Sequence, residues 1–530
     1  MTEHSEALVK LGLTLAALAV LAWRARMRPR DGKAGAALGL LGVLGAAAYF
    51  NFLTFHGGRF IHFAEMFHYE LGSKYFPELG YDGLYVASLE AQAESAPALP
   101  LPRVVRDLRT NTIVPVESLD QHRGEVRKRF APQRWRRFVA DHAAFLDPAD
   151  LRALNGVRLD HGYNPTPAWT FVGRLFNAWV PLDATTLPLM AVVDWLVLAA
   201  TFVVVFRTFG SAVGATALVV FGAGYPWRYA WVGGAFLRYD WLAAVVVGIC
   251  LLKRRRFAGA GVAFAYAAAV RLFPAFLLLG VAALAVRDLL RRADLRWALR
   301  FAAGLGAGAA ACVLAGSLTG RGFAAWGEFA RDIARHHENW STNAAGLELV
   351  FLDSPQTLAS RIPPAPLQER WAIWQEAMNR AHEARRPFYL AAALLLVAGV
   401  AAAAAARPAD EGAALGAAVV FAALVLSCYY WAVFVALVLR RGAGGAIGVL
   451  GANAAALVAA LATDDTQVVF GVYSWAMTVA LAVLLAPAAV QAIRSRWQPV
   501  EAEADAGTGE PARPAARNAG RSGRRAARGR

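Results

Sequence analysis

The sequence predicts an all-α membrane protein, a polytopic helical bundle of about 13 transmembrane helices with a large first external loop. The chain of 530 residues is 58% hydrophobic and has a mean hydropathy of +0.40, which is far too apolar for a soluble protein. Many of its apolar runs approach the ~20 residues that cross a bilayer as a helix. Short arginine-rich stretches separate several runs, as is typical of cytoplasmic loops.

The apolar runs divide the chain into six consecutive parts. These are the first two transmembrane helices (1–54), an external, periplasmic region (55–186), transmembrane helices that include a short hairpin at 257–286 (187–318), a second external loop (319–386), C-terminal transmembrane helices (387–497) and a disordered basic cytoplasmic tail (498–530). The expected spans, in order, are Ala7–Trp23, Ala34–Thr54, Leu187–Phe206, Ser211–Tyr225, Asp240–Leu252, Phe257–Val270, Leu272–Val286, Ala298–Leu318, Pro387–Ala406, Gly412–Leu426, Tyr429–Leu439, Gly442–Leu461 and Val468–Ile493.

Flanking charge gives the expected direction of these spans. Acidic residues precede Ala7–Trp23 and arginines follow it, which reverses the charge order of a cleavable signal peptide. We therefore expect the N-terminus outside, with Ala34–Thr54 carrying the chain outward again and packing closely through its small residues. Basic loops at 24–33, 253–256, 287–296 and 440–441 should be cytoplasmic. The expected location is a cell membrane, the cytoplasmic membrane of a bacterium, with the C-terminus in the cytoplasm.

Arg271 interrupts two apolar segments that are each too short to span a bilayer comfortably. Phe257–Val270 and Leu272–Val286 are flanked on both outer sides by clusters of lysine and arginine. Because both clusters should be cytoplasmic, the segments form a hairpin rather than one tilted helix. This places Arg271 near the outer face, where a guanidinium could hold a phosphate group.

The formal charge of +16 does not indicate a nucleic-acid partner. The basic residues concentrate in loops beside apolar runs and in the tail, where topology and anionic membrane lipid account for them. All three cysteines lie in apolar runs, so neither a disulfide framework nor a thiolate metal site is expected.

Glu65 is the main candidate for chemistry in the first external region. On a regular helix His62, Glu65 and His68 would share one face just outside the second span. A carboxylate there could act as a general base on an acceptor hydroxyl, or hold a divalent metal such as Mg²⁺ or Mn²⁺ together with His62. The alternative is the solvated face of an interfacial helix. Three other carboxylates in this region compete with Glu65 for the catalytic role, namely Glu70, Glu78 and Asp82.

Other polar residues lie in the second external loop and near the spans. His336 and His337 are adjacent, so they cannot share a helix face, but one of them could donate to a phosphate oxygen. The alternative is an ordinary solvated loop. Asp194 lies in the middle of a span, where a carboxylate is either functional or paired with an arginine. Arg238 lies near an outer membrane face among aromatic residues and is a second candidate for binding a donor phosphate.

The order of these parts resembles the GT-C integral-membrane glycosyltransferases, in particular the polyprenyl-phosphate-dependent mannosyltransferase-like branch (glycosyltransferase family 87-like). The resemblance covers roughly 34–461 and is carried by Glu65 with Tyr69, the Tyr163–Pro167 stretch, Arg271–Pro274, the Asn339–Asn343 stretch with Gly346–Leu347, and Ser427–Trp431. The family usually has an aspartate in the first external loop, where this chain has Glu65. The resemblance implies catalytic roles for Glu65, His68 and Arg271, phosphate binding by Arg238, Arg271, His336 and His337, and substrate binding by Tyr69, Tyr163 and Asn343.

The expected function is therefore transfer of a sugar from a polyprenyl-phosphate-linked donor to a lipid or glycan acceptor on the external face. The sequence contains neither a GxGxxG fingerprint after a strand nor a P-loop, which agrees with a donor that is not a nucleotide sugar. Two alternatives remain at this point. One is a polytopic transporter or lipid flippase in which Asp194, Arg238 and Arg271 line a pathway. The other is a non-catalytic scaffold with the same fold.

Overall fold

The computed structural model describes residues 2–26, 32–336 and 339–494. Helices make up most of these residues, and the strands among them form two small antiparallel pairs. His337 and the predicted tail at 498–530 lie outside the described residues. The expected all-α class is confirmed.

Within the described residues, eight helices are long and apolar enough to cross a membrane. They are α1 (Glu3–Arg26), α2 (Gly32–Tyr49), α11 (Thr186–Phe209), η5 (Phe273–Leu277) continued by α16 (Leu278–Leu290), α17 (Arg296–Ser317), α20 (Leu367–Ala405), α23 (Gly444–Ala462) and α24 (Thr466–Arg494). Three shorter apolar helices are α12 (Ser211–Ala223), α15 (Phe257–Val270) and η8 (Cys428–Leu439). The chain is a multi-pass membrane protein, but the predicted count of about 13 spans is not confirmed. Two expected segments are not among these helices: Asp240–Leu252, which lies in α14 (Asp240–Lys253), and Gly412–Leu426, which is divided between α21 (Ala409–Leu415) and α22 (Ala417–Ala423).

Small residues let neighbouring helices approach closely, as the composition of 34–54 predicts. A Cβ added to Gly222 in α12 would lie 1.8 Å from the carbonyl oxygen of Gly45 in α2. A Cβ added to Gly304 in α17 would lie 1.9 Å from the carbonyl oxygen of Ala258 in α15. Helices in lipid associate through such contacts because lipid tails provide no hydrophobic driving force between them. The short helices α12 and α15 are thus each held against a longer span.

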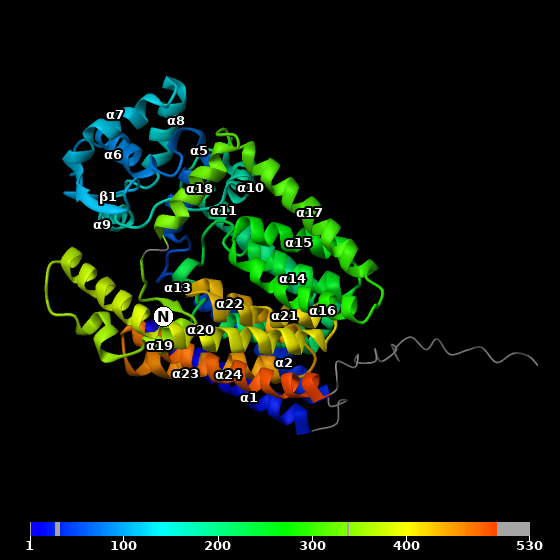
Figure 1. Cartoon of the computed structure of the whole chain (residues 1–530). Coiled ribbons are helices and arrows are strands. Elements are labelled where there is room, and N and C mark those ends of the chain that lie inside the picture. The colour runs from blue at the N-terminus through cyan, green and yellow to red at the C-terminus, as the bar shows by residue number, and fades with distance from the viewer. Residues whose placement is uncertain (1, 27–31, 337–338, 495–530) are drawn as a thin grey trace, which may run out of the picture.

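Residues 55–186 fold into a helical unit at one end of the bundle, which we call the external unit (Figure 1). Its helix α6 (Leu84–Ser95) packs against α7 (Asp120–Lys128) and α8 (Pro132–Ala143). A hairpin of β1 (Val104–Asp107) and β2 (Thr112–Pro115) and the short helix α9 (Leu151–Val157) complete it. The helix α10 (Pro167–Asn177) then leads back to the bundle and packs against α17.

The second external loop differs from the prediction at its C-terminal end. Helix α20 begins at Leu367 and runs through Pro387 without a break, whereas the sequence predicts a span that starts at this proline. The added helical segment is stabilised by Trp374 and Met378, which pack against Leu352 of α19 (Leu347–Leu352). Tertiary packing therefore outweighs the hydrogen bond that the proline removes.

The late spans also differ from regular helices. The segment expected at 429–439 forms the 3-10 helix η8, which rises ~2.0 Å per residue, so its twelve residues reach about 24 Å rather than the ~18 Å of an α-helix. The segment expected at 412–426 is divided near Gly416 into α21 and α22, and it ends in β4 (Leu426–Ser427). Strand β4 pairs with β3 (Ala344–Ala345) from the second external loop. This pairing positions the beginning of η8.

Candidate functional site

Glu65 and Arg238 form an ion pair between the external unit and the bundle. Glu65 lies in the short helix α3 (Phe63–Met66), and Arg238 lies in the loop before α14. The distance from Arg238 Nε to Glu65 Oε2 is 2.9 Å, and the two side chains are 4% and 19% exposed. The main chains are joined nearby, because the N–H of His62 donates to the carbonyl oxygen of Gly234 (3.0 Å). Two segments that are remote in the sequence are therefore fixed against each other.

The helix that carries Glu65 is not the regular helix that the sequence predicts. Helix α3 is followed by a π-helix, η2 (Phe67–Leu71). His62 caps α3, since its Nδ1 accepts a hydrogen bond from the N–H of Glu65 (3.3 Å), and burial lowers the pKa of His62 to about 3. His68 lies within this π-helix and stays within electrostatic range of Glu65 and Arg238. His68 is buried in the external unit with its Nε2 2.8 Å from the hydroxyl of Tyr85.

The regular helix expected under His62, Glu65 and His68 is not present, because His62 caps α3 and His68 lies in the π-helix η2, but His68 stays within electrostatic range of both His62 and Glu65. A π turn is wider than an α turn, so it changes which residues share a face. The neutral ring of His62 orients Glu65, while His68 belongs to the packing of the external unit. The catalytic role predicted for His68 stays a prediction.

Arg271 lies at the break between two short helices, where the sequence predicts it. Helix α15 ends at Val270, and Arg271 has an extended backbone (φ −144°, ψ 123°) before η5 begins. Its Nη1 donates to the carbonyl oxygen of Val270 (2.9 Å), and its Nη2 lies 3.4 Å from the hydroxyl of Tyr69. The residue is 7% exposed. Arg271 thus closes the end of α15 and contacts a tyrosine of the external unit.

Three tyrosines surround the two guanidinium groups. The guanidinium carbons of Arg238 and Arg271 lie 4.1 Å and 5.8 Å from the centre of the Tyr69 ring. The hydroxyl of Tyr429 accepts a hydrogen bond from Arg238 Nη2 (2.6 Å), and its ring lies 4.2 Å from that of Tyr430. Such contacts between cations and ring faces are favourable when they are shielded from water. Burial raises the pKa of Tyr69 to about 12, so its hydroxyl is a neutral donor.

Tyr429 and Tyr430 are site residues that the sequence analysis did not single out. They belong to the aromatic run near the end of a late span, which the resemblance uses only as one matching stretch. Asn343 is connected to this run, because its carbonyl oxygen accepts a hydrogen bond from the N–H of Cys428 (2.8 Å). Tyr163 lies behind Tyr69, with ring centroids 6.1 Å apart, and its hydroxyl shares a hydrogen bond with Thr170. Of the three predicted substrate-binding residues, Tyr69 therefore belongs to the tyrosine cluster, and Tyr163 and Asn343 lie next to it.

The two arginines have donor groups that no protein acceptor uses. Arg238 Nη1 and Arg271 Nε are buried without a hydrogen-bond partner among the described residues. Burial lowers the pKa of Arg238, whereas Glu65 and the tyrosines raise it, and its net pKa lies well above the ordinary value. The pKa of Arg271 is likewise raised. Buried donors are normally satisfied, so these two charged guanidinium groups lack acceptors of the kind that an anion supplies.

Two buried carboxylates fix the loop that carries Arg238. Asp194 Oδ1 accepts a hydrogen bond from the N–H of Tyr239 (2.9 Å). Asp240 Oδ2 accepts one from the hydroxyl of Tyr266 (2.8 Å), and its charge lies within electrostatic range of both Arg271 and Arg238. Asp194 thus has a structural hydrogen bond to the residue that follows Arg238.

The competing carboxylates of the external unit have other partners. Glu78 forms an ion pair with Arg134 (2.7 Å), and Asp82 forms one with Arg129 (2.9 Å). Glu70 Oε2 accepts a hydrogen bond from Asn177 Nδ2 (2.8 Å).

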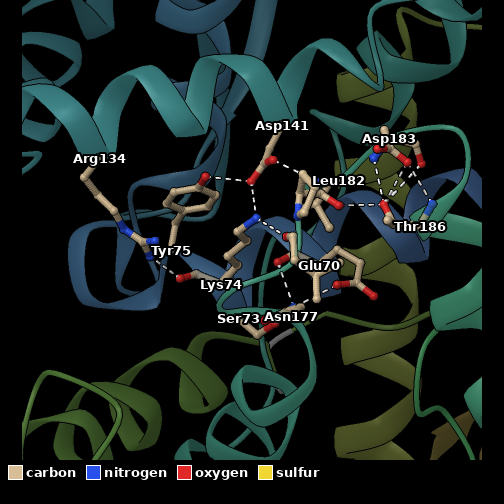
Figure 2. A network of polar contacts seen from close by, with 12 residues as sticks. Glu70, Ser73, Lys74, Tyr75, Arg134, Asp141, Asn177, Leu182, Asp183 and Thr186 are labelled. Atoms are coloured by element: carbon tan, nitrogen blue, oxygen red, sulfur yellow. Dashed lines mark hydrogen bonds and ion pairs between the residues drawn. The ribbon is translucent and has the colours of Figure 1, made fainter.

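Glu70 lies in the polar network of Figure 2, where Asp141 accepts hydrogen bonds from the Tyr75 hydroxyl and the Leu182 N–H and pairs with Lys74 (2.5 Å). Glu65 is therefore the carboxylate of the first external region that the structure places against an arginine of the bundle.

The remaining predicted site residues are outside this cluster or outside the described residues. His336 is the last residue of α18 (Ala324–His336), and His337 is not among the described residues. The described residues contain no group of three or more histidine, cysteine, aspartate or glutamate side chains that could hold a metal ion. The nearest charged partner of Glu65 is a cation, so the residues at hand do not fit the predicted metal site formed with His62.

Comparisons of this chain with protein-family models, curated proteins and solved structures gave no match. The site can therefore be interpreted only from its own geometry and chemistry.

Proposed function

We propose that this protein is a membrane glycosyltransferase of the GT-C type, which transfers a sugar from a polyprenyl-phosphate-linked donor to a lipid or glycan acceptor. The observation that carries the proposal is the meeting of Glu65, Arg238 and Arg271 around Tyr69, with donor nitrogens of both arginines unused. A phosphate leaving group requires fixed cations, and an acceptor hydroxyl requires a base. This cluster offers both groups within one site.

In the proposed reaction, the bond between the anomeric carbon and the phosphate oxygen breaks while the acceptor oxygen bonds to that carbon. The electron pair of the breaking bond leaves with the phosphate, and Arg238 and Arg271 stabilise the charge that develops there. Glu65 accepts the proton of the acceptor hydroxyl. A phosphate on Arg238 would compete with Glu65 for the guanidinium, so binding of the donor would free the Glu65 carboxylate from its ion pair.

No step of the proposed reaction uses a metal ion. The carboxylate faces a guanidinium rather than further acidic ligands, and the two arginines supply the positive charge that a phosphate requires.

The test is a transfer assay in membranes with a fluorescent polyprenyl-phosphate sugar and matched amounts of folded protein. Glu65→Gln and Arg271→Ala should each reduce the rate by about 10²- to 10³-fold, the usual cost of removing a group that stabilises charge in the transition state. Asp82→Asn is the control, because Asp82 pairs with Arg129 in the external unit. Near wild-type transfer by both site variants would contradict the proposal.

Transport remains the alternative, and the surroundings of Asp194 weigh against it. A transport pathway requires charges that a substrate can reach, whereas this carboxylate holds the N–H of Tyr239 and the residue is 2% exposed. Exchange of lipid headgroups in reconstituted vesicles, without a covalent product, would favour transport. Unchanged cell-envelope glycans after replacement of all external carboxylates by alanine would favour a scaffold.

A further inference from the structure

A cavity lies at the opposite end of the bundle from the external unit. Its volume is about 550 Å³. It is formed where the last turn of α1, the end of α11, the beginning of α12, the end of α14 and the loop between η8 and α23 meet. The sequence predicts basic loops at 24–33, 253–256 and 440–441 on one side of the membrane. Arg24, Lys253, Arg440 and Arg441 from these three stretches line the cavity. The fold thus gathers separate basic loops around one space.

The cavity has a strong excess of positive charge. Four basic side chains line it, those of Arg24, Lys253, Arg440 and Arg441. The acidic residue in the lining is Asp410, whose Oδ2 lies 3.8 Å from Lys253 Nζ. Glu411 lies behind the lining and contacts Arg441 (3.4 Å). Asp410 and Glu411 are thus ion-paired with two of the four basic side chains, and the charge of Glu411 also lies within electrostatic range of Arg440.

The other two cations, Arg24 and Arg440, have no carboxylate within 4.0 Å among residues 2–26, 32–336 and 339–494. Arg440 is only 8% exposed, and its Nε is buried without a hydrogen-bond partner in the same residues. A buried guanidinium that lacks an acceptor is costly unless a ligand supplies one. Arg24 is exposed. Arg440 thus offers an anion hydrogen-bond donors deep in the cavity, and Arg24 offers donors near its opening.

The rest of the lining is largely apolar. Side chains of Leu21, Phe209, Val213, Val438 and Leu439 face the same space. A free phosphate ion gains nothing from such walls, whereas a lipid could place hydrocarbon against them and its headgroup against the arginines.

We propose that this cavity binds the phosphate headgroup of an anionic membrane lipid, with Arg440 and Arg24 as its main ligands. The site is separate from the Glu65–Arg238 cluster and lies at the other end of the spans. It does not depend on the proposed glycosyl transfer, since it rests on charge, burial and shape alone.

The experiment uses the full chain in nanodiscs of phosphatidylcholine, with phosphatidylglycerol added in steps, and native mass spectrometry to count retained lipids. The wild-type protein should retain phosphatidylglycerol in preference to phosphatidylcholine. Arg440→Gln should weaken this retention by about tenfold, the effect of losing one charge-assisted hydrogen bond. Arg24→Gln should weaken it less, because Arg24 is exposed and its interactions are screened.

Arg300→Gln is the matched control, because Arg300 is an exposed arginine of α17 that does not line the cavity. Its retention of phosphatidylglycerol should equal that of the wild type. If Arg440→Gln does not fold, the comparison of Arg24→Gln with Arg300→Gln decides. Equal retention of the two lipids by the wild type, or equal loss in the control, would overturn the proposal. Displacement of the lipid by millimolar inorganic phosphate would show that the site selects free phosphate and would also overturn it.

Discussion

Glu65 and Glu70 lie in the same short helical stretch and are the same residue type, but their surroundings are opposite. The Glu65 side chain is 19% exposed and faces Arg238, beside a second arginine and three tyrosines. Glu70 is fully buried and is held by the amide of Asn177, near the pair of Lys74 and Asp141 (Figure 2).

The different surroundings of Glu65 and Glu70 indicate different roles, one at a ligand site and one in the stability of the fold. In the external unit, Glu70 and Asp141 are bound by neighbouring side chains that stabilise the fold, although Glu70 Oε1 is buried without a hydrogen-bond partner among the described residues. At the boundary with the bundle, Arg238 and Arg271 keep donors that no group in the described part of the chain accepts. A carboxylate beside unused donors can act on a ligand, whereas one inside a protein network mainly contributes to structure.

This contrast predicts a large difference in activity between two isosteric changes. Glu65→Gln should reduce the rate of sugar transfer by about 10²- to 10³-fold, whereas Glu70→Gln should leave it within about threefold, because amide and carboxyl oxygens both accept a hydrogen bond from Asn177. Initial rates at equal amounts of folded protein check this. A comparable loss in both variants would mean that Glu65 has no distinct role.

The network of the external unit should respond in stability instead. Asp141→Ala removes the partner of Lys74, Tyr75 and the N–H of Leu182. It should lower the free energy of unfolding by about 3 kcal/mol, since a buried cation is left without its pair. Thermal unfolding of the purified chain in micelles measures this. The control is Asp120→Ala, whose side chain is 69% exposed, and its midpoint should not move.

Glu70 should make stability depend on pH. Burial raises its pKa from the ordinary 4.5 to about 7, so the folded state holds its proton more tightly than the unfolded state does. The stability of the wild type should fall as pH rises from about 5 to 7, by about 2 kcal/mol from this group alone. Glu70→Gln removes this titrating group. The free energy of unfolding of the variant should therefore rise relative to that of the wild type as pH increases from about 5 to 7. A constant difference between the two proteins would contradict the assignment.

The smallest effect is expected at His62. Its ring caps α3 and orients Glu65, and loss of a cap costs about 1 kcal/mol, which corresponds to about fivefold in rate if it is felt in the transition state. His62→Ala should therefore slow transfer by about fivefold, and His62→Asn should restore it, because asparagine is a good cap. Equal rates for the alanine and asparagine variants would show that the cap does not position Glu65.

Much of the helical framework could be predicted from local features of the sequence. The apolar runs predicted the ends of most long spans to within a few residues, and Arg271 with Pro274 predicted the break after α15. Glu65 and Arg238 could be named because charged side chains just outside apolar runs are candidates for chemistry, and Tyr69 could be named through the resemblance. The helix pattern failed at His68, where a π turn intervenes, and at Pro387, where packing of Trp374 keeps α20 continuous.

The sequence by itself determined the membrane class, the ends of most long spans, and the residues that cannot be buried cheaply, because hydrophobicity and charge act locally. Only the tertiary structure decided that Glu65 pairs with Arg238, and that the pairing of β3 with β4 brings Tyr429 to the same arginine. It also decided that Glu70 binds Asn177 instead. These outcomes depend on contacts between distant segments. Their free energies come from burial and charge pairing that exist only after the helices have packed.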